Sequence, residues 1–256
     1  MRLAVFSDIH GNLSGLEAVL ADIEAQGGAD VTWCLGDLAA FGPQPAACIR
    51  RIKALAEANE GKDFKVIGGN TDRYMVNGER PRFPSAKDEE SLKKTLSEWQ
   101  HFNAALLWGV EQLSFDDYTF LKQIRGRELS HKVEGYGWVI GYHAVPGNDE
   151  GYLTPETPAD EARDLLLDRE GRLALGGHIH RQFDRDLGHW RAINVGSVGM
   201  PFDVRGQAGW AMLTFENGAV EVELRRVPFD VEAVIREFEA VGYPCSEWSA
   251  KRLRPE

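Results

Sequence analysis

The 256-residue sequence lacks three features that would place it in other classes of protein. Its cysteines, Cys34, Cys48 and Cys245, are odd in number and form no C-x-x-C pair, which is typical of a reduced, intracellular chain. No apolar run approaches the roughly 20 residues of a membrane span. Residues 1–6 are too short for the apolar core of a signal peptide. We therefore expect a cytoplasmic protein that does not associate with membranes.

Positive charge is also scarce. The chain has 29 Lys and Arg against 40 Asp and Glu, which gives a net charge of −11. A surface of this sign does not attract a phosphate backbone, so strong nucleic-acid binding is not expected. Any ligand that carries phosphate would need a local source of positive charge. Hydrophobic residues make up 43% of the chain, which excludes disorder and is enough to build a core without disulfides or structural zinc.

The first seventy residues alternate between strand and helix patterns. Short apolar runs at residues 3–6, 31–35 and 64–67 read as buried strands, and each stops at a polar or glycine-rich motif. Helical spacing of apolar residues from 13 to 23, and a second helical segment after Pro43, separate these strands. This alternation predicts a parallel sheet covered by helices.

The pattern changes after Asp72. Residues from about 73 to 127 carry no strand signal and hold two helical segments, so we expect a cap-like helical insertion lying over the sheet. One apolar stripe in it, expected to be core, consists of Leu92, Leu96, Trp99, Phe102, Leu106 and Val110. The second half is rich in strands, expected at 133–142, 173–175, 189–195, 210–215 and 220–227, and a helix at about 230–241 follows. Because no linker or repeat interrupts the chain, residues 1–256 are expected to form a single domain.

Residue types that bind metals stand directly after the predicted strands. Five such motifs occur along the chain: Asp8-x-His10, Gly36-Asp37, Gly69-Asn70, His143 and Gly177-His178-Ile179-His180. In extended backbone, residues i and i+2 point the same way, so the members of a D-x-H or H-x-H pair can reach one ion together. In open α/β sheets, ligands bind beyond the carboxyl ends of the strands. These motifs are therefore expected to meet in one cavity.

Each motif also has an ordinary interpretation. Alone, a D-x-H motif is more often a turn, and a Gly-Asp pair more often caps a helix. A Gly-Asn pair is more often a turn that tolerates positive φ, and a single histidine is more often a strand residue with ordinary hydrogen-bond partners. Gly-His-x-His is a stronger metal signal. The occurrence of all five in this order, each after a strand, favours a metal site over five separate turns.

The ordered motifs resemble the signature of the calcineurin-like metallophosphoesterases: D-x-H, G-D, G-N-[HTCM]-[DE], H and G-H-x-H. Residues 36–45, GDLAAFGPQP, are similar to the G-D-x-x-x-[YF]-G-P-x-P segment of a bacterial and archaeal phosphodiesterase branch. Residues 194–201, NVGSVGMP, are similar to the N-P-G-S-V-G-x-P turn of that branch. Matching blocks extend from Asp8 to about Pro228, so they cover most of the chain. The resemblance implies an α/β (α+β) fold, a four-layer αββα sandwich around two mixed sheets with a helical insertion over the site.

The resemblance also implies two metal ions and their ligands. Asp8, His10, Asp37 and His180 would hold one ion, and Asp37, Asn70, His143 and His178 the other, with Asp37 bridging. Oxygen and imidazole ligands without a thiolate suit divalent transition metals. We expect manganese, with iron, zinc or nickel as alternatives.

The activity implied is hydrolysis of phosphodiester or phosphoanhydride bonds in a small phosphorylated substrate, by in-line attack of a metal-bridging hydroxide. The residues assigned to catalysis are Asp37, Asn70, Asp72 and His143. One position departs from the phosphatase pattern, because Thr71 stands where many members have a histidine that protonates the leaving oxygen. A threonine hydroxyl is too weakly acidic for that role, so a preference for good leaving groups is expected. Asp72 would orient a ligand or a water.

Three other functions remain open. A phosphomonoesterase or Ser/Thr protein phosphatase of the same superfamily would need another acid in place of Thr71. A non-catalytic interaction scaffold on the same fold would be free to lose ligands, whereas every ligand position here is filled. A nuclease is disfavoured by the negative charge. His131, His189 and His101 are expected in surface or packing roles, and Arg205 is a weak candidate for a phosphate contact.

Overall fold

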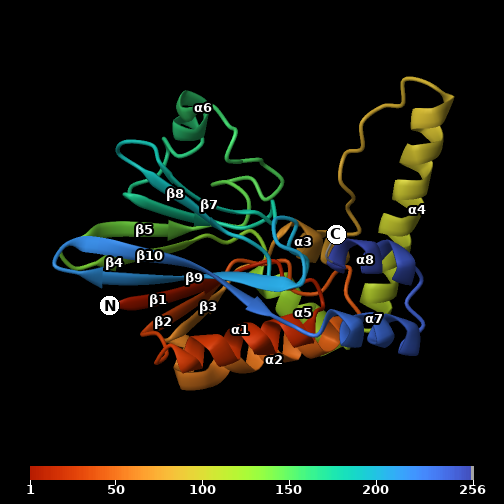
Figure 1. Ribbon diagram of the computed structural model, residues 1–256, viewed down its shortest axis with the longest axis horizontal. Helices are drawn as coiled ribbons and strands as arrows, with labels where there is room; N and C mark the ends of the chain where they lie inside the picture. Colours follow the sequence, from red (N-terminus) through yellow and green to blue (C-terminus); the bar gives the residue numbers. More distant parts are fainter. Residues whose placement is uncertain (255–256) are drawn as a thin grey trace.

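The computed structural model describes residues 1–254, apart from the side chains of residues 59 and 60. Two mixed five-stranded sheets stack face to face (Figure 1). The first sheet has the order β10-β9-β1-β2-β3, with β1 parallel to β2 and antiparallel to β9. Its strands are β1 (Arg2–Phe6), β2 (Val31–Cys34), β3 (Phe64–Val66), β9 (Gln207–Glu216) and β10 (Ala219–Pro228).

The second sheet has the order β4-β5-β6-β8-β7. Its three central strands run parallel, and each edge strand is antiparallel to its neighbour. The strands are β4 (Leu129–Val133), β5 (Gly137–Gly141), β6 (Leu173–Gly176), β7 (Gln182–Asp186) and β8 (Arg191–Val195).

Helices cover both outer faces, which confirms the expected four-layer fold. In Figure 1, α1 and α2 lie against the outer face of the first sheet, and the short α6 lies beyond the second. The helices are α1 (Leu13–Ala25), α2 (Pro45–Glu57), α3 (Asn70–Asn77), α4 (Glu89–Glu111), α5 (Phe115–Ile124), α6 (Ala159–Asp164), α7 (Val231–Ala240) and α8 (Ser246–Leu253), with a 3-10 turn at Ala58–Gly61.

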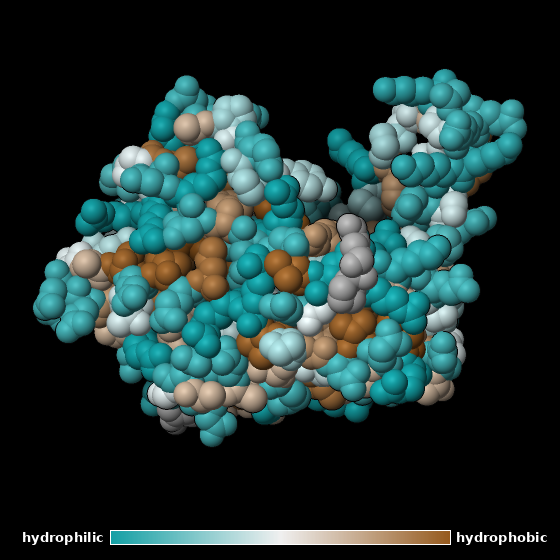
Figure 2. All heavy atoms as spheres, in the orientation of Figure 1, coloured by the Kyte–Doolittle hydropathy of each residue, from teal (hydrophilic) through white to brown (hydrophobic). Residues whose placement is uncertain are grey.

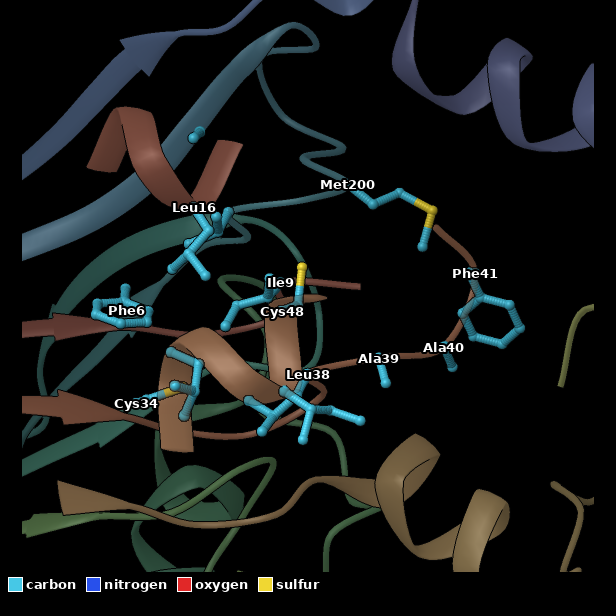
Figure 3. Packing of buried hydrophobic residues seen from close by; sticks show 14 of the residues in the cluster. Phe6, Ile9, Leu16, Cys34, Leu38, Ala39, Ala40, Phe41, Cys48 and Met200 are labelled. Atoms are coloured by element: carbon cyan, nitrogen blue, oxygen red, sulfur yellow. The ribbon is translucent and has the colours of Figure 1, made fainter. Parts of the chain in front are cut away.

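Alternation along the central strands creates two cores. In β1, Leu3 and Val5 point between the sheets, whereas Ala4 and Phe6 pack against the helices. Figure 3 shows the helix-side cluster around Phe6, to which α1 contributes Leu16. A third cluster covers the outer face of the second sheet. Because both faces of β1 are buried, the carboxyl end of this strand is fixed in position, and the Asp8-x-His10 motif begins there.

Several expected elements differ in the structure. The strand expected at 133–142 contains only the last residue of β4, a tight turn and all of β5, and Val133 pairs with Gly137 across that turn. Strand β7 and helices α3, α6 and α8 were not predicted. Each of these elements is short or polar and carries a weak apolar pattern.

The expected insertion contains most of α3 and all of α4 and α5, and its apolar stripe is only partly core. Ala105 and Leu106 are buried, but Leu92, Leu96 and Trp99 are 47%, 45% and 43% exposed. The prediction that the whole stripe is core is therefore wrong. The physical reason is visible in Figure 1, where the first turns of α4 project away from the body and have no layer to pack against.

Candidate metal centre

Both sheets contribute to one cluster of polar side chains. Asp8 and His10 follow β1, Asp37 follows β2, and Asn70 opens α3 after β3. From the second sheet, His143 follows β5, and His178 and His180 follow β6. All of these side chains are buried except that of His178, which is partly exposed. The structure thus brings together all seven residues expected as metal ligands.

On one side of the cluster, two histidines face each other. The Nε2 atoms of His10 and His180 are 3.0 Å apart, and Asp8 Oδ1 lies 3.2 Å from His180 Nε2. Asp37 Oδ2 is 3.7 Å from His10 Nε2. Two imidazole nitrogens at this separation need a proton or a cation between them, because their lone pairs otherwise repel.

On the other side, Asp37 Oδ2 lies 3.4 Å from His143 Nε2. The Asn70 amide oxygen is 3.0 Å from the same nitrogen and 3.1 Å from Nδ1 of His178. The same Asp37 oxygen therefore lies between the two groups of residues. This is the arrangement required of a carboxylate that bridges two ions.

Three of the histidines are oriented by backbone carbonyls. The Nδ1 atoms of His10, His143 and His180 lie 3.0, 2.8 and 2.7 Å from the carbonyl oxygens of Ala40, Leu35 and Met200. When Nδ1–H donates to a carbonyl, Nε2 is the nitrogen that remains to bind a proton or a cation, and in each case Nε2 faces the cluster. This tautomer and orientation are those that a metal-binding histidine needs.

Five of the seven expected ligands stand on left-handed backbone rather than on extended strands. Positive φ angles occur at Asp8 (59°), His10 (48°), Asp37 (56°), His178 (71°) and His180 (57°). Such angles are uncommon for residues other than glycine and concentrate at functional sites. The expected convergence is present, but the i, i+2 geometry of a strand is not its cause. Tight turns immediately beyond the strands aim these side chains.

Two glycines make room for the cluster. A Cβ atom at Gly69 would overlap the side chains of Asp37 and His143, and one at Gly177 would overlap Asp8 and Ser7. Both glycines directly precede an expected ligand. The Gly-Asn and Gly-His pairs in the sequence thus reflect close packing around the site as well as turn formation.

Asp72 is fully buried behind the cluster and holds its backbone. Its Oδ2 accepts hydrogen bonds from the N–H groups of Asp37 (2.8 Å) and Gly69 (3.0 Å), and its Oδ1 from that of Leu38 (2.9 Å). Burial and the negative charge of Asp37 raise the pKa of Asp72 to about 7, although the three donors favour its charged form. Asp72 does not line the cavity at the site, so its geometry is that of a positioning residue.

The ionisation of the cluster suits cations. Burial and the charge of His180 lower the pKa of His10 to about 4, so its imidazole is neutral at physiological pH. Burial opposes ionisation of Asp8, but nearby His180 lowers the pKa of this carboxyl to about 2. Burial likewise opposes the charge on His143, which the adjacent Asp37 overcomes, raising the pKa of His143 to about 10. The carboxylates of Asp8 and Asp37 are thus anionic, and their negative charge attracts cations to the cluster.

Two buried atoms of this cluster accept or donate no hydrogen bond within residues 1–254: Asp8 Oδ1 and His178 Nε2. Such atoms are costly unless a ligand satisfies them. Together with the facing nitrogens of His10 and His180, they show that the donor set fits divalent cations. Two groups, one of Asp8, His10 and His180 and one of Asp8, Asp37 and His143, place their ligand atoms within 4.8 Å of one another.

A cavity of about 490 Å³ opens beyond these ligands. Its walls include Phe41 and several aromatic and charged residues that no motif had indicated, namely Tyr74, Glu98, Phe102, Trp248 and Arg252. Thr71 also lines it, and its buried hydroxyl has no hydrogen-bond partner within the described residues. The signal that could have found Phe41 is its place inside the G-D-x-x-x-[YF]-G-P segment. Tyr74 lies on α3, beyond the part of that helix that belongs to the G-N-x-D motif. The remaining four wall residues lie on α4 and α8, whose sequences carry no motif.

The weaker candidates lie elsewhere. His189 is exposed and contacts Trp190, and His131 lies in the edge strand β4. His101 is only partly exposed, with its ring 6.0 Å from that of Trp248. Arg205 does not line the cavity, although its charge acts on Arg252.

Comparison with known proteins defines the class. The family model described as calcineurin-like phosphoesterase matches residues 1–182, which is more than two thirds of the chain. The chain therefore belongs to the calcineurin-like phosphoesterase family, whose members depend on two metal ions, and it is a phosphoester hydrolase.

Two relatives illustrate the range of the family. The chain is 29% identical to the protein MJ0912 of Methanocaldococcus jannaschii, over 98% of this chain and 96% of that one. It is 32% identical to the symmetrical bis(5′-nucleosyl)-tetraphosphatase of Klebsiella pneumoniae, but over only 30% of this chain and 25% of the enzyme.

Solved structures share the fold along nearly the whole chain. The hypothetical protein PH1004 of Pyrococcus horikoshii OT3 aligns with a TM-score of 0.78 over 98% of this chain and 97% of its own. A metallophosphoesterase of Sphaerobacter thermophilus aligns with a TM-score of 0.70 over 99% of this chain and 98% of its own. Both are 23% identical to the chain, so the likeness concerns the fold. Among the described residues, no helix is long and apolar enough to cross a membrane.

Proposed function

We propose that the protein is a two-metal hydrolase of phosphodiester or phosphoanhydride bonds in a small substrate. The observation that carries this proposal is Thr71. It lines the cavity beside the ligand Asn70, where a proton donor would serve a poor leaving group, and its hydroxyl cannot act as one near neutral pH. Asp72 does not replace it, because both its oxygens accept backbone hydrogen bonds behind the cluster.

In this proposal Asp8, His10, Asp37 and His180 hold one divalent ion, and Asp37, Asn70, His143 and His178 hold the other. When bound, the two ions would activate water and neutralise charge on a phosphoryl oxygen. The chain positions these ligands through Asp72 and through the carbonyls behind His10, His143 and His180. Oxygen and imidazole donors without a thiolate favour manganese as the physiological metal, with iron, zinc or nickel as alternatives.

Support for phosphoanhydrides as well as diesters comes from the partial match to the bis(5′-nucleosyl)-tetraphosphatase. The leaving groups of aryl diesters and of phosphoanhydrides are weak bases, so they need little protonation when they depart. A cytoplasmic location is part of the same proposal. The three cysteines are buried and unpaired, as expected of a chain that works in a reducing compartment.

The test is an assay of the manganese-reconstituted protein on four substrates. These are bis(p-nitrophenyl) phosphate, p-nitrophenyl phosphate, phosphoserine and diadenosine tetraphosphate. We expect the diester and the anhydride to be hydrolysed faster than phosphoserine by about 100-fold or more, the scale of a missing general acid. Rapid release of phosphate from phosphoserine would instead favour a monoesterase, and a protein that binds metal but cleaves none of the four would favour a scaffold.

A further inference from the structure

The cavity is larger than the reacting phosphoryl group requires. Its volume of about 490 Å³ lies in the range of sites for whole small molecules. Metal ligands form its floor, while α8 and the insertion form the outer wall. Figure 2 shows a deep notch between the body of the molecule and the projecting end of α4. The parts of a substrate beyond the reacting group must therefore contact residues outside the metal centre.

One residue of that outer wall is Arg252, which is held flat against Trp248. Its guanidinium carbon lies 3.4 Å from the centroid of the indole ring, and its Nη1 donates to the Trp248 carbonyl at 3.0 Å. Trp248 in turn packs against Phe41, with ring centroids 6.0 Å apart. A guanidinium stacked in this way is fixed in orientation before any ligand binds.

Phe41 links this wall to the metal centre. Its ring centroid is 5.6 Å from that of His10, and its backbone has a φ of 78°, which is unusual for a large side chain. Figure 3 shows Phe41 and Met200 at one end of the hydrophobic cluster, away from Phe6. Two ring contacts therefore separate the ligand His10 from the stacked pair of Trp248 and Arg252.

The charge of Arg252 is poorly compensated. Its side chain is only 30% exposed, and its carboxylate partner, Glu98 of α4, lies 3.8 Å away. Burial lowers the pKa of Arg252, the charges of Glu98 and Tyr243 oppose this shift, and the positive charge of Arg205 has a smaller effect in the same direction as burial. The indole N–H of Trp248 is buried and has no acceptor in the described part of the chain. An anion at this position would relieve the repulsion between the two arginines.

We propose that Arg252, positioned by Trp248, binds a second phosphoryl group of the substrate, one that is not the group cleaved at the metal centre. The proposal rests on the proposed function and deepens it: the preferred substrates are phosphoanhydrides that carry at least two phosphoryl groups. The overall charge of −11 makes such a specific cation necessary, because the rest of the surface repels a polyanion. Phe41 and Phe102 border the space left for the organic part.

The test compares Arg252→Gln with the matched control Arg254→Gln. Arg254 directly follows α8, pairs with Glu232 and does not line the cavity. Calorimetry of the manganese-loaded protein with α,β-methylene-ADP measures binding directly. We expect Arg252→Gln to weaken binding about 10- to 100-fold, as for loss of a charged hydrogen-bond donor, and Arg254→Gln to leave it unchanged. Kinetics should show kcat/KM falling much more for diadenosine triphosphate than for bis(p-nitrophenyl) phosphate, mainly through KM.

Glu98→Gln separates this role from a structural one. If the Arg252–Glu98 contact merely fastens α8 to α4, both variants lower the melting temperature equally and neither alters selectivity. If Arg252 binds phosphate, Glu98→Gln removes a competing carboxylate and tightens binding of the analogue. Arg82 is a second arginine that lines this cavity. Equal losses on both substrates, unchanged calorimetry, or an effect confined to Arg82→Gln would overturn the proposal. Absence of any hydrolysis by metal-loaded wild type would contradict the proposed function alone, since the calorimetry still decides the role of Arg252.

Discussion

His10 and His180 illustrate how single residues define this site. Their Nε2 atoms approach to 3.0 Å, while each Nδ1 is committed to a backbone carbonyl. Neither ring can turn away without losing that hydrogen bond, so the two lone pairs are held facing each other. Such an arrangement stores repulsion that a cation removes, which increases metal affinity.

Asp37 is the residue on which both ions are expected to depend. Its Oδ2 lies 3.7 Å from His10 Nε2 and 3.4 Å from His143 Nε2. We expect Asp37→Ala to lower the metal content at both positions and to abolish turnover, as measured by elemental analysis and by assay. The control is Asp184→Ala, an exposed carboxylate paired with Arg191. Retention of two ions per chain in Asp37→Ala would contradict the bridging role.

Thr71 gives a second prediction at this scale. Thr71→His introduces an acid beside Asn70 and should raise the turnover of alkyl monoesters relative to diesters, by at least about 10-fold if the ring reaches the leaving oxygen. Thr71→Val removes the hydroxyl without adding an acid and should give no such gain. The measurement is the ratio of rates on phosphoserine and bis(p-nitrophenyl) phosphate. Wild type that already prefers phosphoserine would show that another acid operates.

At the scale of elements, the insertion is expected to control substrate choice. The later turns of α4 are anchored by Ala105 and Leu106, whereas the earlier turns project from the body. Replacing residues 82–98 with a short Gly-Ser linker should therefore keep the metal content and reduce kcat/KM for large substrates more than for small ones. Parallel loss of metal and of activity on every substrate would mean that this segment supports the core.

Helix α5 depends on one buried carboxylate at its start. Asp117 accepts two hydrogen bonds from Arg50 and one each from the N–H and hydroxyl of Ser114, which caps the helix. Burial opposes the charge, but the hydrogen bonds from Arg50 and Ser114 and the charge of Arg50 together outweigh it and lower the pKa of Asp117 below its usual range. Because the folded pKa lies below the unfolded value, the stabilisation is complete above about pH 4 and disappears as the pH falls further.

Asp117→Ala should consequently lower the free energy of unfolding at pH 7 by about 1–2 kcal/mol, the scale of a lost capping interaction. Near pH 3 the difference in the free energy of unfolding between Asp117→Ala and wild type should be smaller. Urea titrations at the two pH values measure this, with Asp116→Ala at an exposed position as the control. A difference that stays constant between pH 7 and pH 3 would argue against a charged role for Asp117.

The elements that the sequence predicted are those with two buried faces or a buried stripe. Strands β1, β2 and β3 are near-continuous apolar runs, and α1 begins at Leu13 as expected. Strand β7, in contrast, has the sequence QFDRD, in which only Phe183 is buried, so it carries no apolar run. Strand β4 was missed for the same lack of an apolar run, because its sequence is LSHKV, and the strand expected at 133–142 included only its last residue, Val133.

The candidate metal ligands could be predicted because their residue types and positions after strands are local properties. The cavity wall could not, since Trp248 and Arg252 lie on the short α8, and Phe102 meets them only through tertiary packing. The left-handed turns at Asp8 and Asp37 were also missed, because those conformations are set by contacts between loops. Motif and strand thus indicate the chemistry, whereas the selectivity depends on the fold.

For the whole molecule, the fold should outlast the loss of metal. Three hydrophobic clusters pack around and between the sheets independently of the polar cluster. We expect chelation by EDTA to lower the melting temperature by several degrees, as for any ligand that binds only the folded state, and to leave the far-ultraviolet circular dichroism unchanged. Addition of Mn²⁺ should restore the melting temperature. Unfolding on chelation at 25 °C would show that the clusters alone are insufficient.

The division of the ligands between the two sheets has a mechanical consequence. Asp8, His10, Asp37 and Asn70 follow strands of one sheet, and His143, His178 and His180 follow strands of the other. Bound ions would therefore add a non-covalent cross-link to the apolar core between the two layers and to the hydrogen bonds that Gln182 donates to the carbonyls of Trp210 and Arg225. Apolar contacts resist separation of layers but offer little resistance to sliding. Metal binding should therefore damp shear of one sheet over the other, and amide hydrogen exchange should slow at β1 and β6 together, although they are far apart in sequence.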